Sequence, residues 1–371
     1  EISQAHLIMG SATPRVTQFY KARQGQYQLL ELPHRINTAK PQEKAAELPK
    51  VEVVDMRLEL KTGNSSVFSR ALKQALQETL AKGEQAILFL NRKGSATYVF
   101  CRDCGEALLC PTDGKALIYH RSRQRLVCHL CGYTRQMPKT CPHCGSKAIR
   151  SLGLGTERLE DLVNEAFPEA RVLRWDGETT TAKGQHDLIL SHFSAHRADF
   201  LIGTQMLAKG LDLPLVTLVG VLLAEVGLNL PDYRAAERSF QVLTQVSGRA
   251  GRSALGGRVI MQTYMPENYV IQYVARHDTL GFYEKELAFR RELGYPPFSR
   301  LTKLEYRHLK ADKARETAGT VYAILQEEIQ ARGLKAYSVS HPLPSYYPRI
   351  GGEYRYQMIL RGQDPYPLLK S

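Results

Sequence analysis

Two hydrophobic patterns alternate along most of the chain. Short runs of consecutive apolar residues are typical of strands buried on both faces, whereas apolar residues that recur every three or four positions are typical of amphipathic helices. The runs predict strands at His6–Gly10, Val51–Met56, Ala86–Asn91, Arg171–Arg174, Asp199–Thr204 and Leu215–Leu223. The helical pattern is found at Val67–Lys82, Glu157–Phe167, Lys183–Phe193, Ala235–Arg249 and Val270–Leu293. This order predicts an α/β fold with a mainly parallel sheet covered by helices on both faces.

Three segments depart from this alternation. Residues Pro33–Lys50 are polar, contain proline and show no periodicity, which predicts a connector. A cysteine-rich stretch interrupts the alternation as an insertion. Tyr295-Pro296-Pro297 ends the last helix, because two prolines cannot continue it. The residues from about Phe298 therefore predict a separate small α+β domain, with Arg355–Arg361 as its last strand.

The charge of the chain narrows the class of partner. Its 371 residues are enough for two or three domains, and 50 Lys and Arg against 37 Asp and Glu leave a net charge of +13. This excess favours a polyanionic partner. The longest uncharged apolar run, Leu213–Ala224, is shorter than the ~20 residues of a membrane-spanning helix, so no membrane association is expected. The chain opens at Glu1 without an export signal, which predicts a cytoplasmic protein.

The cysteines predict a metal-binding insertion. Each Cys-x2-Cys turn presents two thiolates, and zinc prefers four ligands in a tetrahedron, so two such turns complete one site. Where thiols stay reduced, this spacing favours metal over disulfides. Three complete pairs and one half pair therefore predict two zinc ions. The residues with this spacing are Cys101, Cys104, Cys110, Asp113, Cys128, Cys131, Cys141 and Cys144.

Asp113 occupies the position at which an eighth cysteine would complete the fourth pair. A carboxylate can ligate zinc, so a site of three cysteines and Asp113 is one interpretation, although structural zinc sites favour thiolate. His120 and His129 are alternative ligands, and both also fit solvated side chains beside the cluster. Four protein ligands leave no open position for water, so neither ion is assigned a catalytic role.

Arg249 and Arg252 lie three residues apart in the stretch Gln245 to Arg252. Guanidinium groups placed in this way can neutralise charge on a γ-phosphate, as arginine fingers do. The same stretch also fits a helix C-terminus with glycine caps and arginines that balance the helix dipole. A second stretch, Leu201–Gly210, follows a buried strand and brings small and hydroxyl residues to the carboxyl edge of the sheet, where phosphates bind. The two stretches together favour the nucleotide interpretation.

With these stretches the sequence resembles the superfamily two helicases. The matching residues are Ser11-Ala12-Thr13-Pro14 for motif III, Phe89-Leu90-Asn91-Arg92 for motif IV, Gly203-Thr204-Gln205 to Lys209-Gly210 for motif V, and Gln245 to Arg252 for motif VI. A double zinc insertion between motifs IV and V is similar to that of the PriA family of primosomal replication restart helicases. Gly153–Glu157 and Tyr295–Phe298 resemble the same family. The resemblance covers essentially the whole chain and implies the C-terminal part of such a protein.

This resemblance implies a domain organisation, cofactors and partners. Residues 1–58 would be the end of a first helicase lobe and a connector, 59–100 and 151–294 a RecA-like second lobe, 101–150 the double zinc-binding insertion, and 295–371 a truncated C-terminal α+β domain. The implied cofactors are ATP, magnesium and two zinc ions. The implied partners are replication forks, single-stranded DNA, primosome proteins and the single-strand binding protein.

The resemblance also implies roles for single residues. Arg249 and Arg252 would contact ATP across the two lobes, accompanied by Gln245 and Gly248. Motif V would line the path of the single strand through Gly203, Thr204, Gln205 and Lys209, and motif III would link hydrolysis to lobe movement through Ser11 and Thr13. One zinc site would be Cys101, Cys104, Cys141 and Cys144, and the other Cys110, Asp113, Cys128 and Cys131.

The chain contains neither a Gly-x4-Gly-Lys-[Ser/Thr] loop nor an acidic Asp-Glu-x-His box, and ATP hydrolysis needs a phosphate cradle and a metal carboxylate. The isolated chain is therefore expected to be inactive, as a truncated helicase that in full length unwinds DNA 3′ to 5′ at stalled forks and initiates primosome assembly. The alternative is a natural, non-catalytic zinc-containing DNA-binding primosome assembly protein. A zinc-ribbon transcription factor would explain the cysteines but not Gln245 to Arg252.

Overall fold

The computed structural model describes residues 7–32, 48–91, 99–111, 116–120, 124–128, 133–151, 154–177, 179–180, 184–208, 213–230, 232–251 and 255–369. The chain divides into two compact units. The first unit is Glu1–Arg92, Leu154–Gly227 and Ala236–Glu284, and the second is Lys93–Gly153, Leu228–Ala235 and Lys285–Ser371. Among the described residues, no helix combines the length and the apolar composition needed to cross a membrane.

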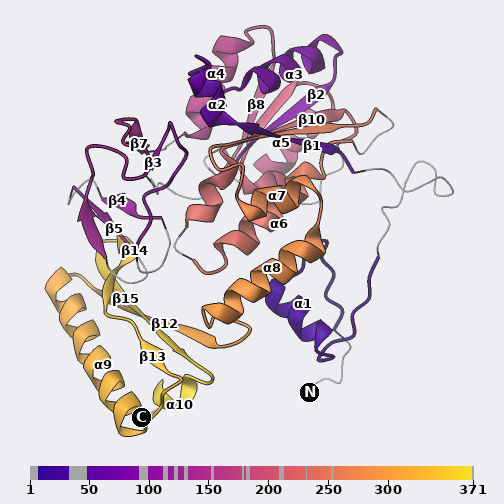
Figure 1. The fold of residues 1–371 in the computed structure, drawn as a ribbon. Coiled ribbons are helices and arrows are strands. Elements are labelled where there is room, and N and C mark those ends of the chain that lie inside the picture. Colours follow the sequence, from indigo (N-terminus) through magenta and orange to yellow (C-terminus); the bar gives the residue numbers. More distant parts are fainter. Residues whose placement is uncertain are drawn as a thin grey trace. The chain divides into compact units, whose positions relative to one another are not determined.

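The first unit is built on a six-stranded parallel sheet (Figure 1). In sheet order its strands are β1 (Lys50–Asp55), β11 (Arg258–Thr263), β10 (Val216–Leu222), β2 (Gln85–Leu90), β9 (Phe200–Gly203) and β8 (Val172–Trp175). Every neighbouring pair is parallel. Strands β10, β2 and β9 are buried along their whole length, which explains their uninterrupted apolar runs. The predicted α/β fold with a parallel sheet is confirmed.

Helices cover both faces of this sheet. Figure 1 shows α3 (Arg70–Ala81) and α4 (Thr156–Ala166) on one face, and α5 (Gln185–Ser194), α6 (Ala235–Ser247) and α7 (Tyr269–Ala275) on the other. The buried residues of α3 recur every three or four positions, as the amphipathic pattern predicts: Leu72, Ala75, Leu76 and Thr79. Two further helices of this region are α1 (Val16–Arg23) and α8 (Thr279–Glu292).

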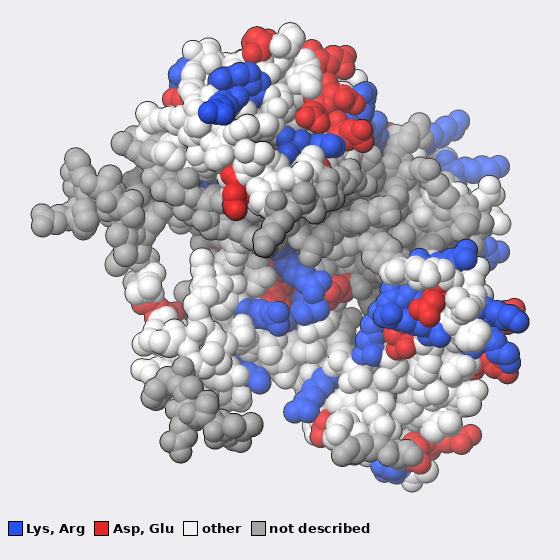
Figure 2. Space-filling view, turned by 180° about the vertical axis from the view of Figure 1, so that it is seen from behind, with Lys and Arg blue, Asp and Glu red and all other residues white. Residues whose placement is uncertain are grey.

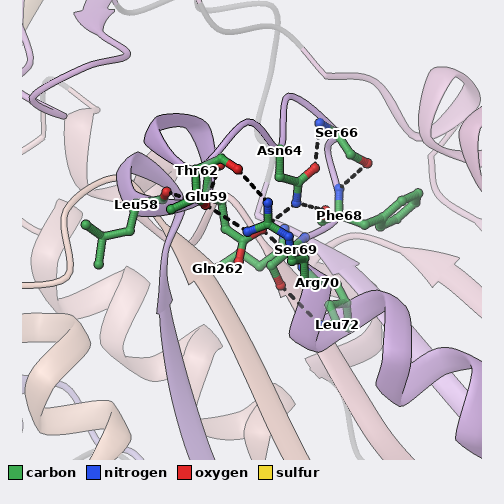
Figure 3. A network of polar contacts seen from close by, with 10 residues as sticks. All are labelled: Leu58, Glu59, Thr62, Asn64, Ser66, Phe68, Ser69, Arg70, Leu72 and Gln262. Atoms are coloured by element: carbon green, nitrogen blue, oxygen red, sulfur yellow. Dashed lines mark hydrogen bonds and ion pairs between the residues drawn. The ribbon is translucent and has the colours of Figure 1, made fainter.

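The loop between α2 (Met56–Lys61) and α3 is fixed by side chains at both of its ends (Figure 3). Glu59 accepts hydrogen bonds from the side chain of Asn64 and, at 3.2 Å, from the backbone N–H of Arg70. Gln262 of β11 accepts a hydrogen bond of 2.7 Å from the N–H of Ser69, whose hydroxyl caps α3. Because Ser69 is the N-cap, α3 begins three residues later than the hydrophobic pattern predicts.

The second unit contains small antiparallel sheets. In the cysteine-rich part, β3 (Val99–Cys101) pairs with β7 (Ile149–Ser151), while β4 (Ile118–His120), β5 (Arg125–Val127) and β6 (Thr134–Gln136) form a three-stranded sheet. In the C-terminal part, β15 (Glu353–Gly362) pairs with β12 (Arg300–His308), β13 (Ser338–Val339) and β14 (Leu343–Ile350). The helix α9 (Ala311–Ala331) packs on this sheet, and α10 (Tyr366–Leu369) follows it. The C-terminal part therefore combines helices with an antiparallel sheet, with more strands than the sequence predicted.

Two predicted elements are wrong in part. Of the strand expected at His6–Gly10, the described residues 7–10 form no strand, and Leu7 and Ile8 are 82% and 87% exposed. A strand needs a neighbour for its backbone hydrogen bonds, and no described strand pairs with these residues. The helix expected at Val270–Leu293 is two helices, α7 and α8, because Asp278 accepts a hydrogen bond from the N–H of Gly281 and starts a new helix.

A buried ion pair lies in α8. Glu286 and Arg290, one helical turn apart, are 1% and 0% exposed, and the Arg290 Nε donates to Glu286 Oε1 at 2.8 Å. The Arg290 guanidinium also lies 5.3 Å from the ring centroid of Tyr233. Two charges removed from water in this way are tolerated only while each compensates the other.

We expect Glu286→Ala to lower the free energy of unfolding by about 3–5 kcal/mol, because it removes the buried carboxylate that Arg290 Nε contacts at 2.8 Å. Urea denaturation followed by circular dichroism measures the change. The double variant Glu286→Leu/Arg290→Met replaces both charges by apolar groups and should recover most of the loss. If the double variant were as unstable as Glu286→Ala, the lost packing rather than the broken ion pair would explain the effect.

Candidate functional site

The four cysteines predicted for the first zinc site come together in the second unit. Cys101 ends β3, and the antiparallel pairing of β3 with β7 places it opposite Ile149, close to the turn that carries Cys141 and Cys144. All four Sγ atoms, including that of Cys104, lie within 4.8 Å of one another. The short pairing of β3 with β7 thus joins two Cys-x2-Cys turns that are far apart in sequence.

The sulfur separations fit a tetrahedral zinc ion. A zinc–sulfur bond of ~2.3 Å places the sulfur atoms of a tetrahedron about 3.8 Å apart. The Sγ atoms of Cys101 and Cys144 are 3.6 Å apart, and those of Cys104 and Cys141 are 3.7 Å apart. Both distances are much longer than the ~2.05 Å of a disulfide. Four thiols in this arrangement match a closed structural metal site.

The two turns have the same backbone geometry. The N–H of Gly105 donates to the carbonyl of Cys101 at 2.8 Å, and the N–H of Gly145 donates to that of Cys141 at 2.9 Å. The φ angles of the two glycines are 78° and 73°. This left-handed region is accessible to glycine without strain, which explains a glycine directly after the second cysteine of each pair.

Burial and backbone donors act on the thiols in opposite directions. Burial raises the pKa of Cys104 above its ordinary value. At Cys141, burial acts in the same direction, but the N–H groups of Cys144 and His143 donate to the sulfur and hold the pKa below its ordinary value. A cation between the four sulfur atoms favours the thiolate form of all of them.

The second predicted zinc site is described only in part. Cys110 and Cys128 are each 1% exposed and belong to the same buried cluster as Cys101. Asp113 and Cys131 lie outside the described residues, as do His129 and the side chain of His120. A site of Cys110, Cys128, Cys131 and Asp113 therefore stays a prediction.

In the first unit, the structure brings together two stretches that lie more than two hundred residues apart. Gln245 donates from its Nε2 to the Oγ1 of Thr13 at 2.9 Å. The Ser11 hydroxyl accepts a hydrogen bond of 3.1 Å from the N–H of Thr13, and Thr13 is only 4% exposed. The segment Ser11–Pro14 therefore lies against the end of α6 that leads into Gly248.

The arginines that follow α6 differ in what the structure describes. The N–H of Gly248 donates to the carbonyl of Thr244 at 3.0 Å and continues the helical hydrogen bonding past Ser247. Arg249 is 4% exposed, so its side chain is covered by protein. Arg252 lies outside the described residues. The hydrogen bond of Gly248 fits a helix C-terminus, and the burial of Arg249 means that this side chain packs against other protein groups. A contact of Arg249 with ATP has to be compatible with both observations.

The described residues among those expected along a DNA path lie at the carboxyl edge of the sheet. Gly203 ends β9, and a Cβ at this position would lie 2.7 Å from the carbonyl oxygen of Trp175, so glycine is required for close packing of β9 against β8. Thr204 follows, and Gln205 opens the short 3-10 helix η1 (Gln205–Ala208). Lys209 lies outside the described residues. Thr204 and Gln205 are thus placed where parallel-sheet proteins bind ligands.

Neighbouring strands end at the same edge with buried polar groups. Asn91, which follows β2, is 2% exposed and donates from Nδ2 to the carbonyl of Ala224 at 3.1 Å. Glu225, fully buried, accepts a hydrogen bond of 2.7 Å from the hydroxyl of Thr263 at the end of β11. These contacts hold the loops after β2, β10 and β11 in fixed positions at the edge.

Three residues at the Ser11–Pro14 segment escaped the sequence analysis: Glu237, Gln241 and Tyr283. Gln241 donates from Nε2 to the carbonyl oxygens of Thr13 and Pro14 at 3.0 and 3.3 Å. Glu237 and Gln241 precede Gln245 at intervals of four residues on a predicted helix, so they share its face. That spacing was the available signal for two of them, whereas no sequence pattern links Tyr283 to the segment.

Two family models match the chain. One is described as "Helicase conserved C-terminal domain" and matches residues 106–254, and the other is described as "Primosomal protein N C-terminal domain" and matches residues 291–370. The two matches together include the cysteine-rich part from residue 106 onward, strands β8, β9 and β10 of the sheet, helix α6 and the C-terminal α+β part.

Curated relatives match over nearly the whole chain. The chain is 46% identical over 355 residues to the replication restart protein PriA of Bacillus subtilis (strain 168), which covers 96% of this chain and 43% of the relative. It is 42% identical over 369 residues to the protein of the same name from Synechocystis, covering 97% and 43%. The chain thus spans less than half the length of these relatives.

A solved structure of RecG bound to a three-way DNA junction gives a TM-score of 0.38 at 11% identity, covering 74% of this chain and 26% of that one.

Proposed function

The chain belongs to the PriA family of replication restart proteins, and from this premise we propose that the full-length protein is an ATP-dependent DNA helicase that moves 3′ to 5′ at stalled forks and initiates primosome assembly. The observation that carries the proposal is the hydrogen bond between Thr13 and Gln245. This bond joins the Ser11–Pro14 segment to the stretch Gln245 to Arg252. The positions of these two stretches would have to be linked if ATP hydrolysis is to drive movement along DNA.

In this function Arg249 and Arg252 would approach the phosphates of ATP, and magnesium would be held by residues outside this chain. The direct connection of α6 to Gly248 and Arg249 supports this role, because the position of the helix sets the position of the arginines. Gln245 would position the Ser11–Pro14 segment through its contact with Thr13. Arginine at such a position stabilises the charge that develops on the transferred phosphate.

The DNA strand would run along the carboxyl edge of the parallel sheet, past Gly203, Thr204, Gln205 and Lys209. The net charge of +13 supports a polyanionic partner. On the face that Figure 2 shows, Lys and Arg side chains are interspersed with Asp and Glu.

We propose that the cysteine-rich part binds two structural zinc ions. The sulfur geometry of Cys101, Cys104, Cys141 and Cys144 supports the first ion. Zinc would supply cross-links between the two Cys-x2-Cys turns. The protein's own β3–β7 pairing orients these turns.

The full-length protein should hydrolyse ATP in the presence of forked DNA and separate the strands. The decisive measurement follows phosphate release and strand separation on the same forked substrate. A full-length protein that bound forks and assembled primosome proteins without hydrolysing ATP would instead support the non-catalytic assembly function.

The chain of 371 residues alone should bind single-stranded DNA and hydrolyse no ATP. If it contacts about five phosphates, counterion release predicts that the logarithm of the affinity falls with the logarithm of salt concentration with a slope of about −3.5. Fluorescence anisotropy with a labelled oligonucleotide between low and physiological salt measures the slope. Binding that did not respond to salt, or robust ATP hydrolysis by this chain, would contradict the proposed division of roles.

A further inference from the structure

One face of α6 carries three polar side chains at intervals of four residues, and all three contact the same short segment. Glu237 Oε1 accepts a hydrogen bond of 3.1 Å from the N–H of Val16. Gln241 donates to the carbonyl oxygens of Thr13 and Pro14, and Gln245 donates to the Thr13 hydroxyl. Most of these bonds hold backbone atoms. The helix therefore fixes the path of residues 13–16, and not only one side chain.

A fourth contact comes from another helix. Tyr283 of α8 donates from its hydroxyl to the carbonyl oxygen of Pro14 at 2.7 Å and is 1% exposed. Its ring lies 4.5 Å from that of Phe19, centroid to centroid, so α1 is packed against the same place. Burial and the nearby carboxylate of Glu237 raise the pKa of Tyr283, which keeps the hydroxyl protonated and able to donate. The Pro14 carbonyl thus accepts from both Gln241 and Tyr283.

We propose that Gln241 and Tyr283 are positioning residues that couple ATP hydrolysis to DNA unwinding, by holding the backbone of Thr13 and Pro14 on α6. The inference rests on the proposed helicase function and names residues that the recognisable motifs do not include. Both side chains donate hydrogen bonds to the segment and act through it.

The geometry explains why such a link would transmit movement. A helix moves as a rigid element, so displacement of its side chains at residues 237–245 displaces Gly248 and Arg249 at its end. Hydrogen bonds to backbone carbonyls have directional requirements, so a shift of the segment by more than a fraction of an ångström strains or breaks them. The Thr13–Gln245 bond alone would let Pro14 pivot, whereas Gln241 and Tyr283 hold Pro14 from two helices.

The test uses the full-length protein and the double variant Gln241→Leu/Tyr283→Phe, which removes the donors and keeps the approximate side-chain volumes. Loss of each of the two donor side chains should raise the population of the released segment about fivefold, hence about 25-fold for the pair. Two quantities are measured: the rate of trypsin cleavage after Arg15, identified by mass spectrometry, and the number of base pairs unwound per ATP hydrolysed. Cleavage of a transiently open segment follows the population of the open form.

The matched control is Gln272→Leu/Tyr273→Phe. Gln272 also donates to a backbone carbonyl, that of Pro266 at 2.6 Å, and Tyr273 belongs to the same aromatic cluster through Phe282. The control makes the same two side-chain changes elsewhere in the fold and should leave both measured quantities unchanged. In the test variant, we expect cleavage about 25-fold faster, base pairs per ATP at least about fivefold lower, and ATP turnover within about threefold of the parent.

Three other outcomes would contradict the proposed coupling role. Faster cleavage with an unchanged number of base pairs per ATP would overturn the coupling role and leave a purely structural contact. Unchanged cleavage would show that the two side chains do not hold the segment, which also overturns the inference. If the unsubstituted protein hydrolysed no ATP on forked DNA, the proposed helicase function would fail and the coupling role with it, while cleavage would still report on the contact.

Discussion

Removal of zinc from the cysteine-rich part should unfold it while the parallel sheet stays folded. Binding of a structural zinc ion is worth about 10–16 kcal/mol at neutral pH, more than the whole stability of a typical domain. The part holding Cys101, Cys104, Cys141 and Cys144 has strands of only three residues, so its own hydrogen bonds and core are small. Dialysis against a chelator, followed by metal analysis and circular dichroism, measures the loss.

The sheet has its own reporter for this experiment. Trp175 is the only tryptophan in the chain, is 4% exposed at the end of β8, and donates from Nε1 to the Nδ1 of His186 at 3.0 Å. Its fluorescence should stay at the buried emission maximum when zinc is removed. A shift of this emission together with the loss of zinc would mean that the two units unfold together.

The number of zinc ions bound per chain, measured in the parent and in variants of each site, tests the two predicted zinc sites separately. Two ions should be found per chain, and Asp113→Ala should reduce the number or the affinity at the second site, whereas Asp113→Cys should tighten it. Cys101→Ser should abolish the first site alone. A chain without zinc, or one with a single ion that Asp113→Ala leaves unchanged, would contradict the two-site interpretation.

The main sheet was predictable because its strands are buried on both faces and carry nearly continuous apolar runs. Strand β11 was missed, although it lies between β1 and β10, because its apolar residues form the short run Val259–Met261 beside Gln262. The polar side chain of Gln262 is 1% exposed and serves the loop before α3. A buried glutamine that binds backbone is indistinguishable in the sequence from a surface residue.

The cysteine site and the contacts of the Ser11–Pro14 segment also differ in how far the sequence alone could predict them. The first cysteine site was predictable because each Cys-x2-Cys turn is local and its spacing alone fixes two ligands. The contacts of residues 13–16 with α6 and α8 depend on pairs separated by 221 to 269 residues. Only the tertiary fold brings such residues together, so motif matching indicated the role of Gln245 and could not indicate that of Tyr283.

In the full-length protein, Arg252→Ala and Arg249→Ala should each abolish unwinding while leaving DNA affinity nearly intact. An arginine that contacts the transferred phosphate stabilises charge in the transition state, so its loss lowers turnover, by about 10³- to 10⁵-fold where such arginines have been measured, more than it weakens ground-state binding. Lysine should not restore activity, because it offers a point charge in place of a planar fork. Phosphate release and DNA anisotropy on the same preparations give both quantities.

The burial of Arg249 requires a further control in this experiment. Since its side chain is 4% exposed, Arg249→Ala also removes packing, and its melting temperature must be compared with that of the parent before turnover is interpreted. A variant that is folded at the assay temperature and has lost turnover supports the contact with ATP. If both alanine variants hydrolysed ATP within about threefold of the parent, a loss below ~1 kcal/mol, neither arginine would contact the transferred phosphate. The two side chains would then serve to end α6 and to balance its dipole.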